Sequence, residues 1–98
     1  MLMKDERFFK TIKNFLEIYL LKQKNYSKNT QKSYRESLSL LLQYFKEELG
    51  LGYAQIGFDD LTYTNVCGFL DWLTVSRECS PQTVNLRLMA IRSFAKYS

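Results

Sequence analysis

The sequence predicts an all-α fold, four helices packed around a single hydrophobic core. Apolar residues recur at spacings of three and four in four separate segments, and no segment shows the two-residue alternation of a strand. Polar residues that suit helix N-termini precede three of these segments, and glycines follow one of them. The chain has 98 residues, 46% of them hydrophobic, which is enough for one domain over residues 1–98 with a modest core.

The first predicted helix is the segment that ends at about Lys24-Asn25. Its apolar residues lie on one helical face, at Phe8, Ile12, Phe15, Leu16, Tyr19 and Leu20.

The second predicted helix begins after Ser27 or Asn29, either of which can accept a first-turn N–H group, and ends at Gly50 and Gly52. Its core stripe is Tyr34, Leu38, Leu41, Leu42, Phe45 and Leu49. The stretch 50–60 then reads as a connecting loop, from which Phe58 or Leu61 returns to the core.

A third, shorter helix is predicted after Thr62 or Thr64, with an apolar face of Val66, Phe69, Leu70 and Leu73. The fourth begins at Ser80-Pro81, a cap residue followed by proline at the first helical position. Its predicted core stripe is Val84, Leu88, Ile91 and Ala95, with Phe94 at the edge. Short connections favour helical hairpins between the first and second helices and between the third and fourth.

Composition and targeting signals bound the function. No apolar run approaches the roughly 20 residues of a membrane span, and the N-terminus has no signal-peptide pattern, so a cytoplasmic protein without membrane contact is expected. In that compartment Cys67 and Cys79 are expected to be reduced thiols. Without a histidine to assist them they form no metal site, and no cofactor is expected.

The same composition argues against an enzyme in its own right. The chain has no histidine, the commonest general base, and its paired acids, Glu47-Glu48 and Asp59-Asp60, are neighbours whose side chains diverge on a helix. No glycine-rich segment has the lysine and the context of a phosphate-binding loop.

The charge distribution is more informative than the net charge of +4. Residues 18–35 carry five cations and no acid, residues 36–78 carry seven acids and two cations, and residues 79–98 carry three cations and no acid. Two basic segments therefore flank an acidic one, and the basic segments hold the starts of the second and fourth helices.

In the second helix Lys28, Lys32, Arg35 and Ser39 recur on one face, beside Gln31. Each cation in a first turn destabilises the helix by about 0.3 kcal/mol or more, because its charge opposes the helix dipole. A phosphate at that terminus removes the conflict, because it meets cations, free backbone N–H groups and the short donors Thr30 and Ser33 together. The alternative is that these lysines only keep an exposed helix soluble.

The fourth helix has a polar face opposite its core stripe, made of Gln82, Asn85, Met89, Arg92 and Lys96. Gln, Asn and Arg side chains can form bidentate hydrogen bonds to adenine or guanine in a major groove, and Met89 can meet a thymine methyl group. Arg87 lies nearer the core boundary, where it can bind a phosphate or an acid of the middle segment. The alternative is an ordinary solvated face.

Three sequence stretches resemble the N-terminal core-binding domain of the tyrosine recombinases, the phage-integrase family. They are an Asn-Thr start with a tyrosine four residues after the threonine (Asn29, Thr30, Tyr34), an Asp-Leu-Thr helix entry (60–62), and the Thr-x-Asn-x-Arg-Leu-x-x-Ile-Arg-Ser-Phe run at 83–94. The resemblance covers roughly residues 15–98 and implies a four-helix, SAM-like fold.

The resemblance also implies a function: a double-stranded DNA-binding module whose second and fourth helices approach the major groove. The residues it assigns to DNA, together with those that the charge pattern assigns, are Lys28, Asn29, Thr30, Gln31, Lys32, Arg35, Gln82, Asn85, Arg87, Arg92 and Lys96. Strand cleavage and rejoining would belong to a C-terminal catalytic domain of the parent recombinase, and neighbouring recombinase protomers are further expected partners.

Two other functions remain open. A helical protein-interaction module would use exposed apolar residues such as Leu86, Met89 and Tyr97, or the acidic middle segment. A free-standing transcription regulator is disfavoured, because the glycine-bearing link between the second and third helices is too long for a helix-turn-helix.

Overall fold

The N-terminal helix has two geometries. The computed structural model describes residues 4–98, in which α1 (Glu6–Asn14) runs directly into the π-helix η1 (Phe15–Gln23). Asp5 begins α1 by accepting the N–H of Phe8 at 3.3 Å. The predicted end near Lys24-Asn25 is confirmed, and Asn25 turns the chain with a positive φ of 52°. The π-helical geometry was not predicted, because it leaves no mark in a 3.6-residue periodicity.

Helix α2 (Lys28–Leu49) begins and ends at predicted residues. The Ser27 hydroxyl accepts the N–H of Thr30 at 3.2 Å, and Gly50 ends the helix in the left-handed conformation, at φ 67°. The predicted residues Leu38, Leu41 and Phe45 are buried. The prediction for Leu49 is wrong: its side chain is 39% exposed.

The buried face of α2 is also wider than predicted, because it includes Ser37 and Tyr44. The stretch 50–60 contains two short 3-10 helices, η2 (Tyr53–Gln55) and η3 (Phe58–Asp60). Ile56 between them is fully buried, and Phe58 and Leu61 pack against the core as expected.

Helix α3 (Tyr63–Val75) begins at Thr62, whose hydroxyl accepts the N–H of Asn65 at 3.1 Å. Phe69 and Leu73 are buried as predicted, and Trp72 joins them.

Helix α4 (Pro81–Tyr97) begins at the predicted Ser80-Pro81 pair. Its core face is rotated from the predicted one: Phe94 is fully buried and Ala95 is exposed. The reason is aromatic packing, since Phe94 lies at the centre of a cluster with Phe8, Phe15 and Phe58, at ring-centroid distances of 6.0, 5.5 and 6.2 Å.

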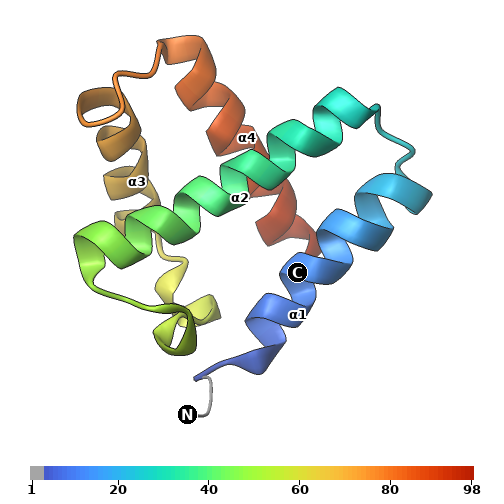
Figure 1. Cartoon of the computed structure of the whole chain (residues 1–98), viewed down its shortest axis with the longest axis horizontal. Helices are drawn as coiled ribbons and strands as arrows, with labels where there is room; N and C mark the ends of the chain where they lie inside the picture. The colour runs from blue at the N-terminus through green and yellow to red at the C-terminus, as the bar shows by residue number, and fades with distance from the viewer. Residues whose placement is uncertain (1–3) are drawn as a thin grey trace.

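The helices form one bundle, in which α2 passes across α4 while α3 and α1 lie on opposite sides of the crossing (Figure 1). Within residues 4–98 no strand is present, so the all-α prediction is confirmed. In Figure 1, α2 begins at the upper right and α4 at the upper left, and the two helices cross between these starts and their C-terminal ends. Both cysteines are free, and none of the described helices has the length and hydropathy needed to cross a bilayer.

Candidate nucleic-acid interface

The exposed face of α2 carries a row of cations, here called the cation stripe: Lys28, Lys32 and Arg35. Lys32 has its ammonium 4.0 Å from a carboxylate oxygen of Glu36, one turn further along the helix. Within residues 4–98, Lys28 and Arg35 form no ion pair within 4.0 Å. Two of the three cations are therefore available to an external anion.

Some polar groups at the start of α2 form hydrogen bonds with neighbouring residues of the same segment. The hydroxyl of Thr30 accepts from the Ser27 hydroxyl at 3.1 Å, and the Gln31 side chain donates to the carbonyl of Tyr26 at 2.7 Å. These two predicted site residues thus also build the start of the helix. In the described part of the chain the N–H groups of Lys28 and Asn29 have no acceptor, and a helix N-terminus with free N–H groups favours an anion.

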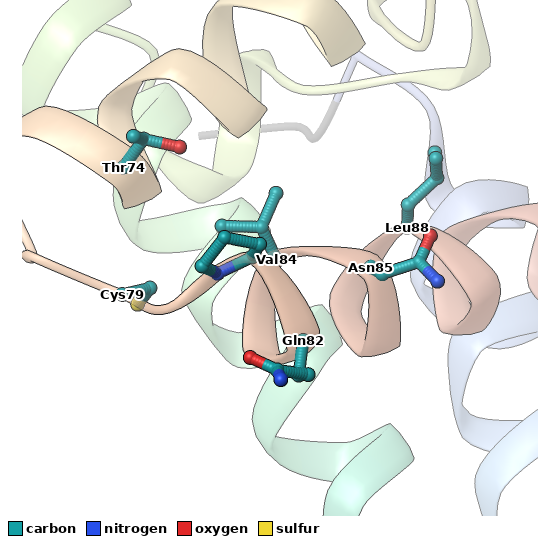
Figure 2. Close-up of a pocket in the computed structure, with 7 residues that line it drawn as sticks. Thr74, Cys79, Gln82, Val84, Asn85 and Leu88 are labelled. Atoms are coloured by element: carbon teal, nitrogen blue, oxygen red, sulfur yellow. The ribbon is translucent and has the colours of Figure 1, made fainter.

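The outer stripe of α4 is exposed along its whole length. It consists of Gln82, Asn85, Met89, Arg92 and Lys96, as the sequence predicts. Met89 is 53% exposed although it is apolar. Figure 2 shows Gln82 and Asn85 on successive turns of α4, beside a surface hollow of about 630 Å³ that Thr74 and Cys79 also line.

Two of the predicted residues on α2 border a hollow that side chains of α4 also line. Asn29 and Thr30 line a hollow of about 360 Å³ together with Leu86 and Met89 of α4. This hollow joins the first turns of α2 to the N-terminal half of α4, so side chains from two basic segments of the sequence border one surface.

Other predicted residues of α4 lie away from this hollow. Arg92 borders a hollow of about 400 Å³ with Tyr63 and Val66 of α3. Lys96 borders one of about 440 Å³ whose lining includes Tyr19 and Tyr97. The outer stripe therefore extends along α4 from the edge where the helix begins to the opposite end of the bundle.

Arg87 points inward. Its side chain is 15% exposed, and one guanidinium nitrogen donates to the carbonyl of Ser33 at 3.3 Å and to the hydroxyl of Ser37 at 3.1 Å. A second nitrogen lies 3.6 Å from a carboxylate oxygen of Glu36. Of the two partners left open by the sequence, the acid of the middle segment is the one Arg87 contacts.

Arg77 is a cation near this surface that the sequence analysis did not select. It follows α3 and lines a hollow together with Arg35 and Arg87. Its sequence neighbours belong to the acidic segment, so only the packing of α3 beside α2 and α4 brings it to the other arginines. No group of three potential metal-ligating side chains occurs within residues 4–98.

Comparisons with known proteins identify the family of this chain. The family model described as "Phage integrase, N-terminal SAM-like domain" matches residues 12–98. The chain belongs to this family. This match confirms the resemblance predicted over residues 15–98 and the SAM-like fold that it implies.

Two relatives come from Sinorhizobium fredii (strain NBRC 101917 / NGR234). "Putative integrase/recombinase y4rC" is 30% identical over 87 residues, which are 89% of this chain and 26% of the relative. "Putative integrase/recombinase y4rD" is 32% identical over 83 residues, which are 85% of this chain and 30% of the relative. The chain thus spans less than a third of the length of either relative. No solved structure gives a significant match.

Proposed function

We propose that this phage integrase N-terminal domain is the DNA-binding module of a site-specific tyrosine recombinase. It grips duplex DNA with α2 and α4 during integration or recombination. The observation that supports this most directly is a hollow that both helices border, lined by Asn29 and Thr30 from the first turn of α2 and by Leu86 and Met89 of α4.

On this proposal phosphates supply most of the affinity. The cation stripe and the free N–H groups at the start of α2 bind the backbone of one strand, where charge and helix dipole act together. Gln82 and Asn85 project from the first turns of α4 and read base edges, because their amides can donate and accept at the same base. Arg92 and Lys96 extend the contacts along α4.

The module does no chemistry alone on this proposal. Its sequence lacks histidine, and strand cleavage and rejoining are assigned to a C-terminal catalytic domain of the parent recombinase. Neighbouring recombinase protomers on the same DNA are further proposed partners, and the cytoplasm is the proposed site of action.

The direct test compares duplex binding by the wild type and by the double variant Lys28→Ala/Lys32→Ala, using fluorescence anisotropy over a range of salt concentrations. Each phosphate contact contributes about 0.9 to the slope of log K against log salt, so the variant should lose about 1.8. The matched control is Lys10→Ala/Lys13→Ala, two exposed lysines of α1. Equal slopes for wild type and Lys28→Ala/Lys32→Ala, with circular dichroism unchanged, would contradict the proposal.

A second candidate function is a protein-interaction module. It is favoured by Leu86 and Met89, adjacent apolar side chains of α4 that are 50% and 53% exposed. Sedimentation velocity separates the two functions: self-association that depends on Leu86 and Met89, in a protein that does not respond to duplex DNA, supports the second one.

A further inference from the structure

Three arginines that are far apart in the sequence border one surface hollow of about 470 Å³, here called the arginine hollow. Arg35 comes from α2, Arg77 from the connection after α3, and Arg87 from α4. Ser39 and Gln43 also line it, and Glu36 is its one lining carboxylate. The site is therefore built by tertiary packing and not by a run of basic sequence.

The charges of the arginine hollow do not balance. Glu36 faces one arginine of the three, Arg87, at 3.6 Å, and it shares its charge with Lys32 at 4.0 Å. Within residues 4–98, Arg35 and Arg77 form no ion pair and donate no side-chain hydrogen bond. Like charges held together around one hollow repel each other unless an anion binds among them.

The positions of these arginines are restrained. Arg87 is fixed by its hydrogen bonds to Ser33 and Ser37, and its Nε is buried without a partner in the described part of the chain. The guanidinium carbon of Arg77 lies 5.4 Å from the centroid of the Trp72 ring. A guanidinium placed against an aromatic ring loses less freedom when it binds a ligand, and its planar fork matches two oxygens of a phosphate.

We propose that the arginine hollow binds a phosphate group, with Arg35 and Arg77 as its direct ligands and Arg87 as a fixed positive charge behind them. This inference rests on the proposed function in one respect: the phosphate is a backbone phosphate of the bound duplex. Ser39 and Gln43 supply further donors at the rim.

The inference enlarges the expected DNA contact. From Lys28 to Arg35 the cation stripe advances seven residues, about 10 Å along α2, which equals about three base-pair steps of about 3.4 Å each measured along the duplex axis. Arg77 adds a cation beside the middle of α2, since it borders the arginine hollow together with Arg35, Ser39 and Gln43. One DNA strand then follows α2 from its first turn to its middle instead of meeting only its first turn.

The test is the variant Arg77→Gln, with Arg7→Gln as its matched control. Arg7 is also exposed and also lies against an aromatic ring, 4.9 Å from the centroid of Phe58, but it does not line the arginine hollow. In duplex-binding titrations Arg77→Gln should reduce the salt slope by about 0.9 and weaken binding at 50 mM salt by on the order of tenfold, while Arg7→Gln changes neither. A wild type that binds duplex with the same salt slope as Arg77→Gln overturns the inference.

A second measurement separates this inference from the proposed function. If the wild type binds no duplex at low salt, the proposed function fails. Titration of inorganic phosphate, followed by nuclear magnetic resonance of the arginine Nε–H groups, then tests whether the arginine hollow binds phosphate without DNA. Saturable shifts at Arg35 and Arg77 that disappear in Arg77→Gln support a site for free phosphate, and their absence overturns the site.

Discussion

At the scale of single residues, one glycine of α3 has a steric role. A Cβ built on Gly68 would collide with the hydroxyl of Tyr44, on the neighbouring helix α2, and lie 3.3 Å from its Cζ. Burial raises the pKa of the Tyr44 hydroxyl, with smaller contributions from Glu48 and Asp71. Gly68 therefore allows α3 to approach α2 at the Tyr44 ring.

The first prediction concerns Gly68→Ala. Alanine favours a helix by about 1 kcal/mol over glycine, but overpacking a core contact costs about 1–3 kcal/mol, so a net loss of stability is expected. Urea denaturation measures it. Gly52→Ala, whose new Cβ would lie 3.6 Å from Gln55, should be near neutral, and Tyr44→Phe should reduce the cost of Gly68→Ala. An unchanged or raised free energy of unfolding for Gly68→Ala alone would contradict the steric role.

The sequence predicted correctly which side chains of the candidate interface are exposed to solvent. Lys28, Lys32, Gln82 and Asn85 are on the surface, as their places in the helical periodicity require. Arg87 differs because a long side chain at a core boundary can turn either way, and the choice depends on an acceptor that another helix supplies.

At the scale of helices, Arg87 ties α4 to α2. It contacts a backbone carbonyl, a buried hydroxyl and a half-exposed carboxylate of α2, at Ser33, Ser37 and Glu36. Because these groups lie on successive turns of α2, one side chain fixes the place where the two helices cross.

The second prediction compares Arg87→Ala with Glu36→Gln. Removing the arginine should cost about 1.5–3 kcal/mol, because hydrogen bonds to a charged donor are lost from a largely buried place. Glu36→Gln should cost less than about 1 kcal/mol, since its carboxylate is half exposed to solvent. Chemical denaturation of both variants measures the difference in free energy of unfolding. A larger loss of stability for Glu36→Gln would contradict the proposed role of Arg87 in joining α4 to α2.

The helices also show where periodicity fails. It located the four main helices but not the two 3-10 helices η2 and η3. It identified the cap Ser80, and it narrowed two others to pairs from which the structure selects Ser27 and Thr62. It misplaced Phe94, because one residue of error rotates a face by about 100° and only the partner rings decide which side is buried.

At the scale of the whole molecule, Lys4 and Asp5, which precede α1, bind the connection between α2 and α3. The Lys4 ammonium lies 2.9 Å from Asp59 and 3.1 Å from Asp60, and the Lys4 backbone N–H donates to the carbonyl of Ala54 at 2.7 Å. Asp5 adds a bond from the N–H of Phe58 at 3.1 Å. These contacts join segments about 50 residues apart in sequence.

The third prediction is a pH dependence of this fastening. The hydrogen bond from Lys4 lowers the pKa of Asp59, and hydrogen bonds to Asp59 and then Asp60 raise the pKa of Lys4. A lowered carboxylate pKa contributes stability above the unfolded value of about 3.9, and that contribution is lost as pH falls through the folded value. Lys4, whose pKa is raised, contributes stability below its ordinary value of about 10.5, and that contribution is lost as the pH rises through the folded value.

Asp59→Asn should therefore lower Tm at pH 7 and have little effect below about pH 3. Thermal unfolding of both proteins at the two pH values measures this. Glu47→Gln, at an exposed acid of α2 that forms no ion pair within residues 4–98, should not show the same dependence. A difference in Tm between Asp59→Asn and wild type that is equal at both pH values would exclude the carboxylate as its source.

The sequence by itself determined the helical class, the positions of the helix starts to within two residues, and the exposed polar faces of α2 and α4. These depend on residues within one or two turns of each other. The tertiary structure alone decided that Phe94 is central, that Arg87 turns toward α2, and that Arg77 joins Arg35. Each of these depends on the angle and depth at which helices cross, and the packing of distant side chains sets that geometry.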